Sequence, residues 1–247
     1  MKNIITAVLL FGVFAACKKE NNDNVIVISA AGDITARVNE FRQLLGDKLN
    51  AAPGATGGRR EINWDGVPDD LLGKPLPANF LNNTEPGAPE SQQRGLIYEG
   101  DTFEVSKTDF SEINPDASGE FTAFSGTKTF TNISDNLWGI GFEVPGEDET
   151  ATVKGFGIVF TDVDVANNTS LEFFDGNKSL GRFFAPVQQP GSKHSFLGVY
   201  FKDQRITKVQ VQHGNGLLNK GEKDISAGGA TDLVILDDFM YDEPVKK

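Results

Sequence analysis

The stretch Ile206-Thr207-Lys208-Val209-Gln210-Val211-Gln212-His213-Gly214-Asn215-Gly216 contains the pattern that decides the fold. Val209 and Val211 alternate with two glutamines, and the run stops at residues rich in Gly and Asn. Successive side chains of a β-strand point to opposite faces, so the valines face a core while the glutamines face water. Gly and Asn accept the positive φ angles of tight turns. The stretch therefore predicts a half-buried strand followed by a turn.

Residues 58–247 repeat this pattern, with turn residues about every 8–12 positions. The expected strands are 61–64, 95–98, 102–105, 121–124, 128–131, 138–144, 153–160, 170–174, 180–184, 195–201, 206–212 and 232–241. So many strands need two layers to cover their apolar faces. We therefore expect an all-β fold, a two-sheet jelly-roll β-sandwich, with an immunoglobulin-like sandwich as the alternative. Residues 68–89 contain five prolines and are expected to form a surface loop.

Residues 33–50 have a different period, which indicates one amphipathic helix. Its apolar residues recur at spacings of three and four: Ile34, Val38, Phe41, Leu44, Leu45 and Leu49. Asp33 is placed to cap the first turn. We expect the stripe with Phe41 and Leu45 to dock on the sandwich, because such a stripe usually faces a core. A helix that binds a partner is the alternative.

The N-terminus has the pattern of a signal peptide over residues 1–16. Lys2 precedes an apolar run from Ile4 to Ala16, which is shorter than the roughly 20 residues of a spanning helix. Cys17, the only cysteine of the chain, follows directly. Residues 14–17, Phe-Ala-Ala-Cys, resemble the lipobox of bacterial lipoproteins, which implies acylation of Cys17. Residues 17–32 would then form the acylated cysteine and a tether, so the domain is membrane-anchored without spanning the bilayer.

Lys18, directly after the cysteine, resembles lipoproteins that are sent to the outer membrane, where the domain would face the periplasm or the cell surface. The chain has a net charge of −12. Nucleic acids and anionic membrane surfaces are themselves negatively charged and would repel it. We expect a glycan or an envelope protein as the partner, and no nucleic acid.

Four segments, residues 58–67, 156–164, 195–199 and 234–239, resemble a group of secreted bacterial lipoproteins with jelly-roll domains and no assigned reaction. The resemblance runs from the helix to the C-terminus and implies fold and export. More distantly, the closing Asp-Asp strand is similar to that of jelly-roll carbohydrate-binding modules. In those modules an aspartate of this strand ligates a structural calcium ion.

Asp237 and Asp238 follow apolar residues in the last expected strand, so one of them faces the core. A buried, unpaired carboxylate is costly and needs a cation, an arginine or a proton. Ca²⁺ prefers such hard oxygen ligands. The resemblance to carbohydrate-binding modules adds Asp65 as their companion ligand. The alternative is an aspartate that caps a turn or pairs with Arg59 or Arg60.

Asp162 and Asp164 form a second acidic spot at a strand exit, with Asn167 and Asn168 in the turn that follows. Alternate residues put both carboxylates on one side of the strand, about 6–7 Å apart at the backbone. This spacing allows them to share a Ca²⁺ ion, although the twelve-residue loop of an EF-hand is absent. An ordinary acidic turn is the alternative.

Sugar binding needs exposed aromatic rings beside polar groups, because the apolar face of a sugar stacks on a ring. The candidates are Trp64, Tyr98 and Tyr200, whereas Trp138 lies between glycines and is expected to be buried. The chain has 19 Phe against 2 Trp and 3 Tyr, which favours rings used as core filler as the alternative.

No catalytic motif is visible: the chain has two histidines, no Gly-x-Ser-x-Gly elbow and no His-Glu-x-x-His. We therefore expect no enzyme, but a non-catalytic binding domain of the cell envelope that recognises a glycan or other surface component, with Ca²⁺ as a stabilising ion. One alternative is a structural or adhesive surface lipoprotein that binds protein through a flat apolar patch. The other is a glycan hydrolase with two facing carboxylates.

Overall fold

The computed structural model describes residues 21–22 and 24–247. The expected signal peptide over residues 1–16 and the expected acylation site at Cys17 lie outside the described residues. Among the residues that are described, no helix combines the length and the apolar character needed to cross a bilayer.

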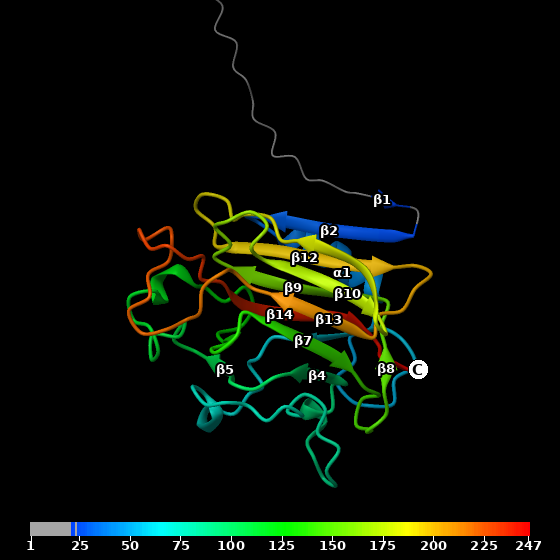
Figure 1. Cartoon of the computed structure of the whole chain (residues 1–247). Coiled ribbons are helices and arrows are strands. Elements are labelled where there is room, and N and C mark those ends of the chain that lie inside the picture. The colour runs from blue at the N-terminus through cyan, green and yellow to red at the C-terminus, as the bar shows by residue number, and fades with distance from the viewer. Residues whose placement is uncertain (1–20, 23) are drawn as a thin grey trace, which may run out of the picture.

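Within this part of the chain, the strands form two packed antiparallel sheets, so the fold is an all-β sandwich (Figure 1). The eight-stranded sheet contains β1 (Asn21–Asn22), β2 (Val25–Ala31), β3 (Arg59–Ile62), β5 (Phe103–Ser106), β6 (Thr129–Asn132), β9 (Gly155–Thr161), β12 (His194–Phe201) and β14 (Ile235–Asp242). The five-stranded sheet contains β4 (Leu96–Glu99), β7 (Leu137–Phe142), β10 (Ser170–Asp175), β11 (Lys178–Phe184) and β13 (Lys208–Gln212). A short pair joins β8 (Ala151–Thr152) to β15 (Val245–Lys246).

The order of the strands is that of a jelly roll. From β6 onward, the chain contributes β6, β9, β12 and β14 to the large sheet. It contributes β7, β10, β11 and β13 to the small sheet. These strands lie in the orders β6-β14-β9-β12 and β7-β13-β10-β11. Such alternation between sheets produces the two interlocked Greek keys of a jelly roll. The expected fold is therefore confirmed, and the immunoglobulin-like alternative is not observed.

The interior between the sheets is built largely from aromatic rings. Phe130 of β6 stacks on Trp64 with 3.9 Å between ring centres and meets Phe239 of β14 edge to face at 5.6 Å. Val209 and Val211 are fully buried in the same core, as their alternation predicts. The Phe-rich composition thus serves the sandwich interior.

The helix α1 (Thr35–Leu45) packs on the outer face of the large sheet and lies behind it in Figure 1. Phe41 and Leu45 are buried there, which confirms the expected docking stripe. Asp33 accepts the N–H of Thr35 at 3.1 Å, but Ile34 occupies the cap position. The helix was expected to run to residue 50 and ends earlier, because Gly46 leaves the helical conformation with a φ of 133°.

The expected tether over residues 17–32 is wrong in its second part, because residues 25–31 form β2. This strand pairs with β12 over its whole length, from Val25 opposite Phe201 to Ala31 opposite Ser195. Ile28 and Ala30 are buried under α1. The sandwich therefore begins well before residue 58.

The expected strand at residues 121–124 is also wrong. The segment is extended after the 3₁₀ helix η3 (Ser118–Glu120), but it bonds to side chains instead of a neighbouring strand. The N–H of Thr122 donates to Thr161 Oγ1, and the N–H of Phe124 donates to Asp237 Oδ2.

Residues 63–95 connect β3 to β4 without a strand, as their prolines predict, and include the 3₁₀ helices η1 (Asp69–Leu71) and η2 (Glu90–Gln92). This connection runs along the lower edge of the sandwich in Figure 1.

Candidate functional site

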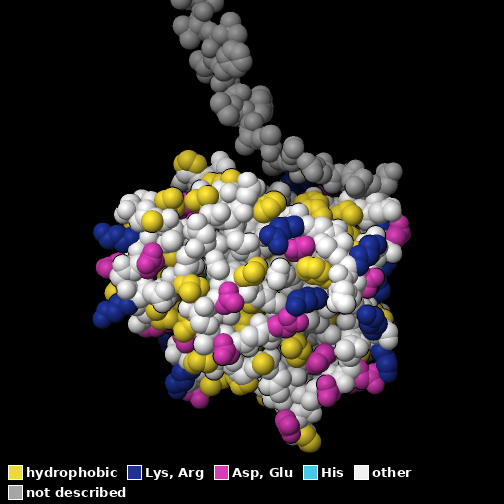
Figure 2. All heavy atoms as spheres, viewed as in Figure 1, with side chains coloured by type: hydrophobic (Ala, Val, Ile, Leu, Met, Phe, Trp, Pro, Cys, Tyr) yellow, Lys and Arg dark blue, Asp and Glu magenta, His cyan; other side chains and the backbone are white. Residues whose placement is uncertain are grey.

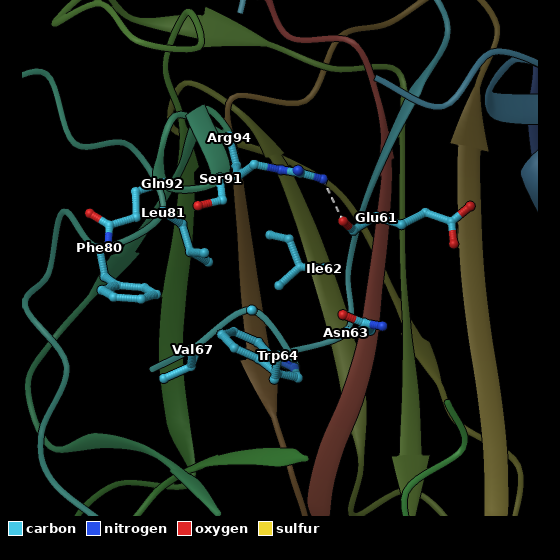
Figure 3. Close-up of a pocket in the computed structure, with 11 residues that line it drawn as sticks. Glu61, Ile62, Asn63, Trp64, Val67, Phe80, Leu81, Ser91, Gln92 and Arg94 are labelled. Atoms are coloured by element: carbon cyan, nitrogen blue, oxygen red, sulfur yellow. Dashed lines mark hydrogen bonds between the residues drawn. The ribbon is translucent and has the colours of Figure 1, made fainter. Parts of the chain in front are cut away.

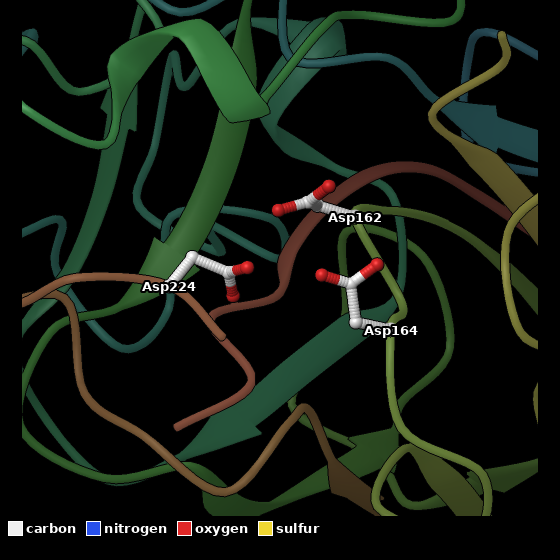
Figure 4. A group of neighbouring side chains, drawn as sticks. All are labelled: Asp162, Asp164 and Asp224. Atoms are coloured by element: carbon white, nitrogen blue, oxygen red, sulfur yellow. The ribbon is translucent and has the colours of Figure 1, made fainter. Parts of the chain in front are cut away.

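Three aspartates meet where β9 leaves the large sheet, at the left end of the sandwich in Figure 1. Asp162 and Asp164 follow β9 directly, and Asp224 comes from the loop between β13 and β14 (Figure 4). One carboxylate oxygen from each lies within 4.8 Å of the other two. The sequence predicted the first two residues as a pair but missed Asp224.

The backbone at this site is held by further carboxylate contacts. Asp232 accepts the N–H groups of Asp164 at 3.0 Å and Val165 at 3.2 Å. Asp224 accepts the N–H groups of Leu233 at 2.8 Å and Ser226 at 2.6 Å. The two loops that carry the three aspartates are therefore fixed to one another by hydrogen bonds to charged groups, which are the stronger kind.

Asp162 has an unfavourable backbone conformation and a buried side chain. Its φ is 69°, in the left-handed region that non-glycine residues rarely adopt, and its N–H donates to the carbonyl of Lys193 at 2.8 Å. The residue is fully buried. Strain of this kind costs about 1–3 kcal/mol and concentrates at functional positions.

The electrostatics of the cluster show that its negative charge is only partly balanced. Burial raises the pKa of Asp162 to about 7 and that of Asp232 to about 6. Burial also raises the pKa of Asp164, whereas hydrogen bonds from the backbone of Leu233 and from Ser226 outweigh burial and lower the pKa of Asp224. The nearby ammonium group, Lys193, lies 3.5 Å from Asp162 Oδ1 and also pairs with Glu120.

Several buried oxygens of the cluster have no hydrogen-bond partner within the described residues. They are Asp162 Oδ2, Asp164 Oδ2 and Gln188 Oε1, although Gln188 Nε2 donates to the Oδ1 atoms of both aspartates. Ca²⁺ binds oxygens at 2.3–2.6 Å, so two ligands of one ion lie at most about 5 Å apart. The 4.8 Å spread of the three carboxylates meets this condition.

The other expected metal ligands, Asp65, Asp237 and Asp238, do not form a cluster of this kind in the described structure. Asp237 and Asp238 lie in a β-bulge of β14. Leu236 pairs with Phe160 and Phe239 pairs with Ile158, so three steps along β14 match two steps along β9. The bulge contains both aspartates, and after it the alternation of side chains is shifted by one residue.

Leu236 and Phe239 consequently both face the sandwich core, while both aspartates are buried beside the 121–125 segment. Asp237 Oδ2 accepts the N–H groups of Phe124 and Ser125, and Asp238 Oδ1 accepts the hydroxyl of Ser125 at 2.6 Å.

An arginine does approach the bulge, but it is neither of the two that the sequence suggested. Arg42 of α1 lies 3.6 Å from Asp238 Oδ2. Arg59 pairs with Glu61 and Arg60 pairs with Glu243.

Asp65 is exposed and accepts the N–H of Thr127 at 2.9 Å, which makes it the cap of a turn.

The expected sugar-stacking rings are not available to solvent. Trp64 is 2% exposed and donates its indole N–H to the carbonyl of Asp237, and Tyr98 is 1% exposed and donates to the carbonyl of Pro77. Tyr200 is partly buried beside the helix cluster. Trp138 is buried, as expected. The prediction of an exposed platform at Trp64 and Tyr98 is therefore wrong, and the core-filler alternative applies to them.

The open face of the five-stranded sheet is defined here as the outward side chains of β4, β7, β10, β11 and β13, and it carries rows of both polar and apolar side chains. One row across it contains Arg182, Glu172, Gln210, Gly139 and Glu99. The neighbouring row contains Phe184 and Leu137, each of which is 43% exposed. Figure 2 looks onto this side and shows hydrophobic side chains scattered among charged ones.

A cleft of about 320 Å³ borders this face near β4 and β7. Ile97, Glu99, Gly141, Thr150, Thr207 and Lys247 are among the residues that line it.

The chain was compared with family models, curated proteins and solved structures, and none of them matches it.

Proposed function

We propose that this chain is a non-catalytic binding domain of the cell envelope that recognises a glycan, with Ca²⁺ stabilising one end of the sandwich. The observation that carries the proposal is the open face of the five-stranded sheet. Its polar row contains amide, carboxylate and guanidinium groups, the cleft borders it at β4 and β7, and the exposed ring of Phe184 lies at the opposite edge, on β11. Such polar groups form hydrogen bonds with sugar hydroxyls, and an exposed ring stacks on the apolar face of a sugar.

Two glycines of β7 support the same use of this face. Gly139 and Gly141 point outward, because their neighbours Trp138 and Ile140 point into the core. A Cβ on Gly139 would lie 2.3 Å from Glu99 Oε2, so a side chain there would displace the polar row. The space above Gly139 is filled by the paired side chains of Glu99 and Lys208, whereas the space above Gly141, which lines the cleft, is open to a ligand.

The calcium part of the proposal is supported by Asp162, Asp164 and Asp224. Their oxygens have the spacing of one ion, and buried oxygens on two of them lack other partners in the described chain. An ion here would join the exit of β9 to the loop before β14, and no chemical step is assigned to it. The envelope location rests on the N-terminal pattern alone and remains part of the proposal.

A glycan array probed with the full chain tests the proposal. We expect binding to one class of glycan, lost in Gln210→Ala and in Glu172→Ala. Gln43→Ala, which removes an exposed glutamine from α1 on the opposite side of the molecule, is the matched control and should bind normally. No binding across a broad array would contradict the proposal. Release of sugar from a bound glycan would instead favour the hydrolase.

The protein-binding alternative predicts a flat apolar patch on the surface. On the face in Figure 2, the hydrophobic side chains are interrupted by charged ones, which favours a polar ligand for this side. Pull-down of an envelope protein by a chain that binds no glycan would reverse this choice.

A further inference from the structure

A pocket at the edge of the sandwich carries an arginine whose charge is not balanced by a carboxylate. The pocket has a volume of about 110 Å³. It lies between the end of β3 with the residues that follow it, up to Val67, and the segment 80–94 (Figure 3). Its walls are apolar: Ile62, Trp64, Val67, Phe80 and Leu81. Its polar groups come from Asn63, Ser91, Gln92 and Arg94. Apolar walls with a few converging polar groups are typical of ligand sites.

Arg94 is held in place by backbone carbonyls. Nη2 donates to the carbonyl of Glu61 at 2.7 Å, and Nη1 donates to that of Ala51 at 3.4 Å. Nε is buried and has no hydrogen-bond partner within residues 24–247. No ion pair joins Arg94 to a carboxylate in this range. A buried donor without a partner is costly, and more so on a charged group.

The carboxylates nearby are already neutralised by other arginines. Glu61 lines the pocket, but its carboxylate binds Arg42 and Arg59 and points away from the pocket in Figure 3. Glu243 binds Arg60 through both oxygens, at 2.7 and 2.9 Å. The positive charge of Arg94 is therefore available to a ligand.

We propose that this pocket binds a small monocarboxylate, with its carboxylate on Arg94 and its apolar body against Ile62 and Phe80. A guanidinium group matches a carboxylate in shape and charge. A cavity of about 150 Å³ admits benzene, so the smaller volume here admits a body of about three to five carbon atoms. The net charge of −12 repels a highly charged polyanion more strongly than a single carboxylate, which favours a monocarboxylate.

The carboxylate could belong to a free acid or to the C-terminal residue of a peptide, and the test separates the two. The full chain is titrated with isobutyrate and isobutyramide, and in parallel with acetyl-alanine and its amide. NMR reports on the indole groups of Trp64 and Trp138, the two tryptophans of the chain. Trp64 lines the pocket, whereas Trp138 lies in the core between the sheets.

We expect the Trp64 signal to shift with a carboxylate and the Trp138 signal to stay nearly constant. Each acid should bind about tenfold more tightly than its amide, because only the acid forms a charge-assisted bond with Arg94. Tighter binding of acetyl-alanine than of isobutyrate assigns the peptide end as the source, and the reverse order assigns the free acid. Equal affinity for acid and amide, or no shift of Trp64, overturns the proposal.

Two variants and a control complete the test. Arg94→Gln should abolish the preference for the acid. Because it also alters the bonds to Glu61 and Ala51, Ser91→Phe serves as a second variant that fills the mouth of the pocket and leaves Arg94 in place. Arg37→Gln on α1 is the control and should bind like the wild type. Retained binding in Ser91→Phe would overturn the proposal. The pocket shares no residue with the open face of the five-stranded sheet, so failure here leaves the glycan proposal intact.

Discussion

Asp237 is fully buried in the bulge of β14, and its ionisation is strongly disfavoured. Burial, together with the neighbouring Asp238, raises its pKa from 3.8 to about 8. Between about pH 4 and pH 8 the folded chain therefore holds a proton that the unfolded chain has released. A state that binds more protons loses relative stability as the pH rises. The contribution of Asp237 is thus fully present below about pH 4 and is lost as the pH approaches 8.

Asp237→Asn should remove this pH dependence. We expect the free energy of unfolding of the wild type, relative to that of the variant, to fall between pH 5 and pH 8 by at most about 1.4 kcal/mol per pH unit. The melting temperature of the wild type should fall with it. Distant carboxyl groups with raised pKa, such as Asp232 and Asp242, cancel in the difference, whereas the adjacent Asp238 interacts with Asp237 and contributes to it. Thermal unfolding by circular dichroism measures it. Parallel profiles for the two chains would show that Asp237 is ionised at neutral pH.

Arg60 and Glu243 form a buried ion pair that should matter far more than an exposed one. Their side chains are 0% and 3% exposed, and Asn50 also donates to Glu243. Glu243→Gln leaves a buried guanidinium without its counter-charge and should lower the free energy of unfolding by about 3–5 kcal/mol. Lys107→Gln, which breaks an exposed pair with Asp69, should change it by at most about 1 kcal/mol. Urea unfolding compares the two; equal effects would mean that water reaches the buried pair.

At the residue scale, sequence patterns identified the buried acidic residues more readily than the groups that contact them. The sequence placed Asp237 and Asp238 in the last strand, but strict alternation assigned them to opposite faces. The bulge breaks that alternation, and no residue in Leu236-Asp237-Asp238-Phe239 indicates a bulge in the way a glycine does. Arg42 could not be identified as a partner, because only the docking of α1 brings it there.

At the element scale, α1 depends on glycines in the sheet beneath it. A Cβ on Gly157 would lie 2.8 Å from Phe41 Cε1, and one on Gly198 would lie 2.8 Å from Phe41 Cδ2. The ring of Phe41 therefore rests directly on the backbone of β9 and β12. The helix is short, and short helices obtain their stability chiefly from such packing.

Gly157→Val should displace α1 and destabilise the chain. Overpacking a filled core costs about 1–3 kcal/mol, while removing the ring in Phe41→Ala costs about 3–5 kcal/mol. Gly119→Ala is the control, because a Cβ at this position would meet only open space. Chemical denaturation measures the three variants. A Gly157→Val chain as stable as the wild type would show that α1 can shift without loss.

The strand β2 shows why one element escaped prediction. Val25–Ala31 is a continuous apolar and small-residue run, and it follows a polar segment that fits a tether. Runs without clear alternation are ambiguous between strand and other structure. Only its pairing with β12, and its cover by α1, define it as part of the sheet. By contrast, the alternating strands β7 and β13 lie within about two residues of their expected positions.

At the scale of the whole molecule, the carboxylate cluster exists because the jelly roll brings distant loops together. Asp224 is separated by about 60 residues from Asp162 and Asp164, and its surroundings in sequence are a glycine-rich loop without regular spacing. Local spacing therefore revealed the pair but not the third member. The crossing of the chain from β9 through the small sheet and back to β14 determines that they meet.

This arrangement predicts that Ca²⁺ stabilises the fold as a whole, because one ion would bind two loops that flank neighbouring strands β9 and β14. A ligand that binds only the folded state raises its stability with the logarithm of concentration, by about 2.7 kcal/mol at 100 times its dissociation constant. We expect chelator to lower the melting temperature of the full chain by several degrees and added Ca²⁺ to restore it.

The response should disappear in Asp162→Asn, which keeps the size of the side chain and its acceptor for Gln188 but removes the negative charge at the fully buried position of the cluster. Asp203→Asn, on an exposed turn, is the control and should respond like the wild type. Mg²⁺ should restore less stability than Ca²⁺, because it requires shorter bonds in near-octahedral geometry. If the wild-type melting temperature is the same with chelator and with Ca²⁺, the three aspartates are held by protons and hydrogen bonds alone. Asp162→Asn would then raise stability at neutral pH, because the pKa of Asp162 lies near 7 and its ionisation is what burial opposes.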